Sequence, residues 1–212
     1  MSSNKVKLTT EALIKEAEEF CKSMSKIKHK NIAGVTDGKA IGTYIEHEFK
    51  GVITSKYTAT IGSSASGIDF PDPEVNTDMK TTFITQPQSS CPFKDARQKI
   101  FGLGYNLLLF VYQKDDSKKH NLEFLHARFI DKTRTADYQT TRGLNEIIER
   151  NGNIDDIKAF LTDRNLPVDD ILLESIAQEI LENPPLIGYL TISNVLQWRL
   201  QYSGVIRIAG KS

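Results

Sequence analysis

The sequence predicts an α/β (α+β) protein in which helices flank a mixed β-sheet core and a helical extension follows. Three observations support this prediction. Helical periodicity fills the first part of the 212-residue chain, short apolar strand-like runs occupy its middle, and helical periodicity returns after Asp131. We therefore divide the chain into a core with its N-terminal helices, residues 1–131, and a mostly helical extension, residues 132–212.

Two helices are expected before the sheet. The first spans about Thr9–His29, with Thr9 or Thr10 as its N-cap, and the second spans about Lys39–Ile53, with Asp37 as its cap. In both segments apolar residues recur every three or four positions, which indicates one buried face per helix.

Four strands are expected in the middle of the chain. Gly67–Phe70 and Thr77–Ile84 are joined by the turn sequence Pro71-Asp72-Pro73-Glu74, and Asn106–Gln113 is followed by its partner Leu122–Ile130. The segment from Thr85 to Ser90 is polar and reads as irregular. The other expected elements are helices over Lys94–Phe101, Arg142–Arg150, Ile154–Asn165, Val168–Glu182 and Ser193–Leu200, and a strand over Val205–Ile208.

Composition and simple motifs exclude several classes of protein. With 27 basic and 27 acidic residues the chain is formally neutral, unlike a protein that coats nucleic acid nonspecifically. Cys21 and Cys91 lie outside any CxxC or Cys/His cluster, so neither a zinc site nor a disulfide framework is expected. No glycine-rich phosphate loop ending in Lys-Ser/Thr is present, so we expect no dependence on ATP.

Nothing in the sequence predicts a membrane protein. The longest apolar run, Leu107–Tyr112, is far too short to span a bilayer, and no signal peptide is recognised. We therefore expect a cytoplasmic protein with no membrane partner.

One segment carries a pattern suited to metal-assisted hydrolysis of a phosphodiester, which needs carboxylates for a divalent ion and a group that orients water. Because side chains alternate along a strand, Asp78 and Lys80 share one face. A hairpin would bring Asp69 beside Asp78, and two close carboxylates favour a bound cation.

The acid-x-lysine pattern is unspecific by itself. It occurs at Asp37-Gly38-Lys39, Glu48-Phe49-Lys50, Asp78-Met79-Lys80, Asp116-Ser117-Lys118 and Asp156-Ile157-Lys158. Only Asp78-Met79-Lys80 lies in an expected strand with an aspartate strand upstream. An exposed strand face with solvated charges remains the alternative interpretation.

The second helix supplies an independent candidate. On its helical wheel Glu48 falls within the apolar face and Glu46 toward the edge of that face. A carboxylate on a buried face is costly unless it is paired or binds a cation. Glu48 is therefore a candidate site residue, and pairing with a neighbouring lysine or arginine is the alternative.

This order of elements resembles the core of the PD-(D/E)xK nucleases, and at this chain length the type II restriction endonucleases. Ser66-Gly67-Ile68-Asp69 is similar to the first acidic motif of the family and Asp78-Met79-Lys80 to the second, with the two aspartates nine positions apart. The match covers roughly residues 38–130. Pro71-Asp72 is a rival for the first motif, although its turn position favours Asp69.

The resemblance implies a restriction-endonuclease-like fold and Mg²⁺-dependent cleavage of double-stranded DNA at a short specific site. It implies Asp69 and Asp78 as metal ligands and Lys80 as the residue that orients the attacking water. It also implies Glu48, or failing that Glu46, as the helix-borne acid. A symmetric homodimer is the expected assembly, since such enzymes commonly read palindromic sites, and the helical extension is the candidate for dimerisation or DNA contact.

The polar segment after the second motif is the candidate DNA-reading element. It contains Gln86, Gln88, Ser89 and Ser90. Glutamine can bond adenine in the major groove, and serine can contact phosphates or bases. A polar surface loop with no role in DNA binding is the alternative.

Two other functions remain open from the sequence alone. One is a structure-specific repair or junction nuclease of the same fold. The other is a non-catalytic DNA-binding module that retains the sheet without the chemistry.

Overall fold

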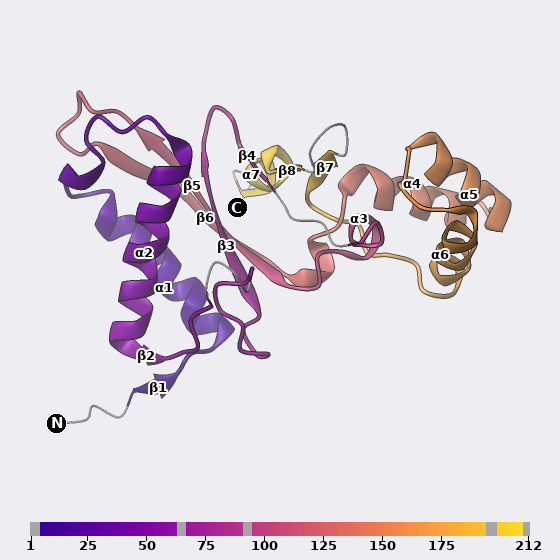
Figure 1. Cartoon of the computed structure of the whole chain (residues 1–212), viewed down its shortest axis with the longest axis horizontal. Helices are drawn as coiled ribbons and strands as arrows, with labels where there is room; N and C mark the ends of the chain where they lie inside the picture. The colour runs from indigo at the N-terminus through magenta and orange to yellow at the C-terminus, as the bar shows by residue number, and fades with distance from the viewer. Residues whose placement is uncertain (1–4, 63–66, 91–94, 194–198, 210–212) are drawn as a thin grey trace. The chain divides into compact units, whose positions relative to one another are not determined.

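The computed structural model describes residues 5–62, 67–90, 95–193 and 199–209. The chain forms two compact units (Figure 1). The first comprises residues 1–89, 105–130 and 209–212, and the second comprises residues 90–104 and 131–208. Cys91, Ser66 and Lys94, which the sequence predictions include, lie outside the described residues.

The first unit is built on a mixed three-stranded sheet. Strand β3 (Thr77–Phe83) pairs in parallel with β5 (Asn106–Lys114), and β5 pairs antiparallel with β6 (Leu122–Ile130). In this register Asp78 lies opposite Leu107 and Lys80 opposite Leu109. The sheet confirms the predicted fold class, a mixed sheet flanked by helices.

Two helices cover one face of this sheet (Figure 1). Helix α1 (Thr10–Met24) packs against β6, and α2 (Gly38–Lys56) packs against β3. The caps are side chains that the sequence predicted. The Thr9 hydroxyl accepts from the Ala12 N–H, and the Asp37 carboxylate accepts from the first turn of α2.

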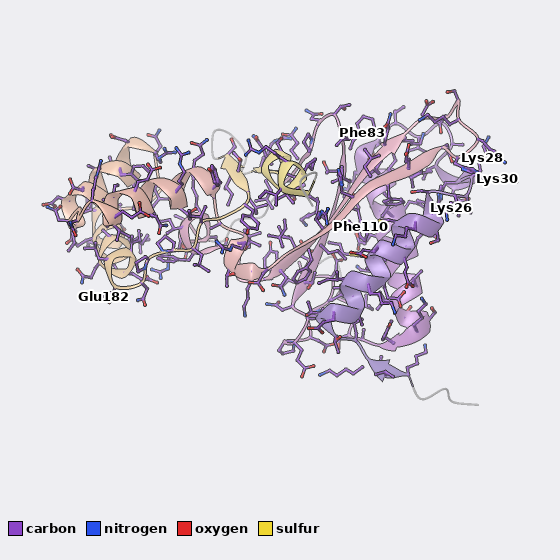
Figure 2. The ribbon with its side chains drawn as sticks, turned by 180° about the vertical axis from the view of Figure 1, so that it is seen from behind. Lys26, Lys28, Lys30, Phe83, Phe110 and Glu182 are labelled. Atoms are coloured by element: carbon purple, nitrogen blue, oxygen red, sulfur yellow. The ribbon has the colours of Figure 1, made fainter. Side chains whose placement is uncertain are left out.

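Aromatic rings fill the space between the helices and the sheet. Phe110 of β5, labelled in Figure 2, meets Phe20 of α1 and Phe49 of α2 edge to face at centroid distances of 5.8 and 5.2 Å. The same core takes in Met79, so one face of β3 is buried here. Since neighbouring side chains alternate, Asp78 and Lys80 project from the opposite face of β3.

Short elements complete the first unit. Strand β1 (Val6–Lys7) pairs in parallel with β2 (Tyr57–Thr58), and a 3₁₀ turn spans Lys30–Ile32. Strand β4 covers Gln88–Ser90, where the chain passes from the first unit into the second. The expectation of an irregular segment up to Ser90 was therefore wrong for its last three residues.

The second unit is mainly helical and has its own apolar core. Its helices are α3 (Gln98–Phe101), α4 (Tyr138–Glu149), α5 (Ile154–Asp163), α6 (Asp170–Glu182) and α7 (Ser203–Ala209). A 3₁₀ turn spans Lys132–Arg134, and β7 (Thr191–Ser193) pairs antiparallel with β8 (Arg199–Gln201). Among the described residues, no helix combines the length and apolar character needed to cross a bilayer.

The end of the chain differs from the sequence prediction. Val205–Ile208, expected as a strand, lies in α7, where the Ile206 N–H donates to the Tyr202 carbonyl four residues back. Tyr202 and Val205 are buried while Ile208 is half exposed, which is a helical rather than an alternating pattern. The helix expected over Ser193–Leu200 was wrong at both ends, because Ser193 lies in β7 and Leu200 lies in β8. Residues 194–198 lie outside the described residues.

Candidate active site

Strand β3 places an acid and a lysine side by side. The Lys80 ammonium lies 2.6 Å from Asp78 Oδ2, and their side chains are 21% and 7% exposed. The shared face predicted from strand alternation is therefore observed. Burial strengthens this ion pair, because water screens it only partly.

The segment before β3 brings the second aspartate to the same place. The Gly67–Phe70 stretch forms a single antiparallel bridge, Phe70 with Thr77, rather than the expected strand. This bridge is enough to turn Asp69 toward β3, where Asp69 Oδ2 accepts the Met79 N–H at 2.7 Å. The carboxyl groups of Asp69 and Asp78 also lie close enough to act on each other's pKa.

The turn between the two aspartates explains why Asp72 is not part of this cluster. The Asp72 carbonyl accepts the N–H groups of Val75 and Asn76, and Asn76 adopts a left-handed φ of 36°. The Asp72 carboxylate accepts both the N–H and the hydroxyl of Thr60 at 3.1 and 3.0 Å. The rival first motif is thus engaged in holding the turn.

The two clustered carboxyl groups respond differently to their surroundings. Burial, together with the neighbouring Asp69, raises the pKa of Asp78 to about 7, although Lys80 opposes the shift. Burial also acts on Asp69, but bonds from Lys50, from Asp78 and from the Met79 N–H hold the pKa of Asp69 below its usual range. The two carboxyl groups together therefore retain a proton near neutral pH when no metal ion is bound between them.

Helix α2 contributes a third acid and a second lysine. Lys50 Nζ lies 2.6 Å from Asp69 Oδ1 and 2.5 Å from Glu46 Oε1, one helical turn away. The sequence analysis did not single out Lys50. The i,i+4 spacing of Glu46 and Lys50 was its only signal, and that spacing does not show that a distant aspartate meets the lysine.

Glu48 lies elsewhere. Its side chain is exposed, so its expected place on the buried face of α2 was wrong. The fully buried residues of α2 are Ile41, Ile45, Phe49 and Ile53. These residues are four positions apart, so the buried stripe winds slowly around the helix. Glu46 and Glu48 lie on opposite sides of the centre of this stripe, each about 80° away around the helix axis. Glu46, and not Glu48, is linked to Asp69 through the shared partner Lys50.

The donor set of this cluster fits a hard divalent cation such as Mg²⁺. Asp69 and Asp78 offer carboxylate oxygens, the ligands that Mg²⁺ prefers, and Mg²⁺ commonly takes only one or two protein carboxylates and keeps several waters. Within the described ranges no three histidine, cysteine, aspartate or glutamate side chains gather closely enough to form a metal-binding group.

The polar segment after β3 presents the candidate DNA-reading residues. Gln86 and Ser90 are exposed, while Gln88 and Ser89 are half-buried within β4. The Gln86 carbonyl accepts the Gln88 N–H at 2.8 Å, which closes a tight turn directly after β3. The side chain of Gln86 is thus available to an external partner.

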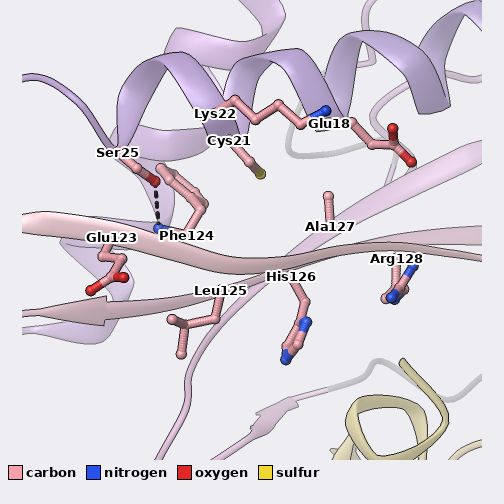
Figure 3. Close-up of a pocket in the computed structure, with 10 residues that line it drawn as sticks. All are labelled: Glu18, Cys21, Lys22, Ser25, Glu123, Phe124, Leu125, His126, Ala127 and Arg128. Carbon is pink, nitrogen blue, oxygen red and sulfur yellow. Dashed lines mark hydrogen bonds between the residues drawn. The ribbon is translucent and has the colours of Figure 1, made fainter. Parts of the chain in front are cut away.

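A groove of about 360 Å³ lies between α1 and β6 and contains none of the clustered acids (Figure 3). Glu18, Cys21 and Lys22 face it from α1, and Ser25 Oγ accepts the Phe124 N–H at 2.8 Å. Burial and the nearby Glu18 raise the pKa of the Cys21 thiol to about 12. The thiol is therefore protonated at neutral pH and unsuited to act as a nucleophile.

Comparison with known proteins identifies the family of this chain. A model of the family described as "Type II restriction enzyme NspV" matches residues 7–212. The chain is 55% identical over 207 residues to the Type II restriction enzyme NspV of Nostoc sp. (strain ATCC 29411 / PCC 7524), which covers 96% of this chain and 93% of that protein. No solved structure matches significantly. The chain therefore belongs to the family of the type II restriction enzyme NspV, whose members are site-specific deoxyribonucleases.

Proposed function

We propose that this restriction enzyme hydrolyses phosphodiester bonds of double-stranded DNA with Mg²⁺ held by Asp69 and Asp78. Type II restriction enzymes generally use a divalent metal ion. The main support for this proposal is that the buried carboxyl groups of Asp69 and Asp78 lie together on one side of β3, with the Lys80 ammonium paired to Asp78. Residues 1–131 form the nuclease core in this proposal.

The side chains have distinct tasks in this scheme. When bound, Mg²⁺ supplies Lewis-acid stabilisation of the phosphate charge and lowers the pKa of a bound water. Asp69, fixed by the Met79 N–H, and Asp78 orient the cation-binding oxygens. The Lys80 ammonium donates a hydrogen bond that orients the attacking water and offsets the negative charge that develops on the phosphate.

Glu46 is the helix-borne acid in this proposal, in place of Glu48. It is linked through Lys50 to Asp69, whereas the Glu48 side chain is exposed. The proposed contacts to bases or phosphates come from Gln86, Gln88, Ser89 and Ser90. These residues directly follow β3, and Gln86 is exposed, which supports this role.

The proposed assembly is a homodimer in which residues 132–212 contribute to dimerisation or DNA contact. A two-fold protein matches a two-fold palindromic site, so each subunit can cut one strand. The enzyme acts in the cytoplasm and without ATP in this scheme. Light scattering at several protein concentrations tests the assembly, with a mass twice the 23.8 kDa of the chain expected.

Digestion of a long DNA of known sequence tests the function. With Mg²⁺ we expect discrete fragments whose sequenced ends share one short motif, and with a chelator we expect no cutting. Asp78→Asn protein is the matched control and should leave the DNA intact. A smear, a preference for branched DNA, or equal cutting by the parent and Asp78→Asn proteins would contradict the proposal.

A further inference from the structure

Lys50 of α2 bridges two acids of the candidate site. Its ammonium bonds Glu46 Oε1 at 2.5 Å and Asp69 Oδ1 at 2.6 Å. Lys50 and Asp69 are only 14% and 13% exposed. For comparison, the Lys7–Glu74 pair at the surface has side chains that are 59% and 66% exposed. The Lys50 bridge is therefore shielded from water, where charge-assisted bonds are stronger than at the surface.

The Lys50 bridge occupies Asp69 Oδ1, an oxygen through which Asp69 would bind a metal ion. Asp69 Oδ2 already accepts the Met79 N–H, and Asp69 Oδ1 accepts Lys50. The Met79 bond comes from the backbone of β3 and fixes the carboxylate in place. The Lys50 bond comes from a side chain with four rotatable carbon–carbon bonds, so Lys50 is the partner that can withdraw.

We propose that Lys50 is a positioning residue that holds Asp69 and Glu46 together before the divalent ion arrives and competes with that ion for Asp69 Oδ1. This inference rests on the proposed role of Asp69 as a metal ligand. Its consequence is that Lys50 sets the metal affinity of the enzyme. Cation and ammonium act on the same oxygen, so removing the ammonium strengthens metal binding while it weakens the metal-free protein.

Titration of the full-length protein with Mn²⁺, in calorimetry without DNA, tests the inference. A charge-assisted bond contributes on the order of 1.5–3 kcal/mol, so we expect Lys50→Met to bind Mn²⁺ roughly 10-fold tighter or more. Lys50→Arg keeps the charge and should retain the parent affinity. Lys56→Met removes another ion-paired lysine of α2, one that contacts Glu16, and should also bind as the parent does.

Thermal unfolding supplies a second readout. Without metal, Lys50→Met should unfold at a lower temperature than the parent because Asp69 and Glu46 lose their partner, and Mn²⁺ should raise its midpoint by more than it raises that of the parent. Lys50→Gln, which keeps a polar side chain, replaces the methionine variant if that variant does not fold. A lysine with only a structural role would lower the midpoint and leave the Mn²⁺ affinity unchanged.

The outcomes separate this inference from the proposed function. If Asp78→Asn binds Mn²⁺ as tightly as the parent, the proposed metal site is wrong and the inference fails with it. If Asp78→Asn loses Mn²⁺ binding while Lys50→Met and Lys50→Gln bind no tighter than the parent, only the competition by Lys50 is overturned. Tighter binding by Lys50→Arg, equal to that of Lys50→Met, would also overturn it.

Discussion

The carboxyl groups of Asp69 and Asp78 lie close enough to act on each other's pKa, although the residues lie nine positions apart and on different sides of a turn. A single antiparallel bridge, Phe70 with Thr77, is the backbone feature that brings them together. Two acids this close, both largely buried, repel each other when both are ionised. Their proximity therefore links protonation, stability and metal binding in the first unit.

The stability of the metal-free protein should fall as pH rises from about 4 toward 7. The folded pKa of Asp78, about 7, exceeds its ordinary value of 3.8, so the folded state binds more protons than the unfolded state across this window. Stability that depends on the protonated acid is present below pH 4 and is lost as pH rises through 7. Urea unfolding at pH 5 and pH 8, in chelator, measures the difference.

Asp78→Asn is the control for this pH dependence. The variant cannot ionise at position 78, so it should lose less stability than the parent between pH 5 and pH 8. At pH 8 without metal it should be the more stable of the two proteins. Equal losses in both proteins would show that Asp78 is not the group that titrates.

Lys80→Met should lower the cleavage rate by about 100-fold or more, since a preorganised charge at a reacting phosphate is worth this much. Binding of specific DNA in chelator should persist, because the lysine acts on the reacting groups. Lys7→Met is the matched control, as Lys7 forms an exposed pair with Glu74, and it should cleave at the parent rate. If the Lys80→Met enzyme cuts as fast as the parent, Lys80 has no role in the reaction.

Glu46→Gln and Glu48→Gln should differ in activity. Glu46 contacts Lys50, which contacts Asp69, so its loss should slow cleavage by about 10-fold or more, whereas the exposed Glu48 should be replaceable without effect. Single-turnover cleavage of one DNA duplex by the two variants makes the comparison. The reverse ranking would restore Glu48 as the helix-borne acid.

Gly42→Ala should destabilise the protein by about 1–3 kcal/mol, because a Cβ there would lie 2.6 Å from the Thr81 hydroxyl of β3. The close approach of α2 to β3 brings the helix-borne groups to the aspartates. Gly51→Ala on the same helix meets nothing within 4 Å and should stabilise by about 0.5–1 kcal/mol. Urea unfolding of both variants checks the pair, and a stable Gly42→Ala protein would show that the helix can move away from the sheet.

Sequence periodicity predicted the elements that position the site. The bounds of β6 match the prediction at both ends, and β5 starts as predicted and ends one residue later. Helix α2 begins one residue earlier and ends three residues later than predicted. These segments have strong apolar patterns, and such patterns are decided by burial, which dominates the folding energy. Asp78 and Lys80 share a face for the same reason, since strand alternation is a local rule.

Two features of the site could not be predicted from the sequence. The contact between Lys50 and Asp69 joins residues of a helix and of the segment before β3, and no local rule relates them. The exposure of Glu48 depends on which flank of the buried stripe of α2 is covered by neighbouring elements, and tertiary packing decides that. At the end of the chain, the β-propensity of Val205 and Ile206 was overridden by packing in α7.

Anomalous diffraction from crystals of the enzyme grown with Mn²⁺ locates the bound metal ion. We expect a peak within bonding distance of carboxylate oxygens from both Asp69 and Asp78, and no such peak in Asp78→Asn crystals. A peak bound by other side chains, or one that persists unchanged in the variant, would contradict the claim that these two aspartates hold the ion.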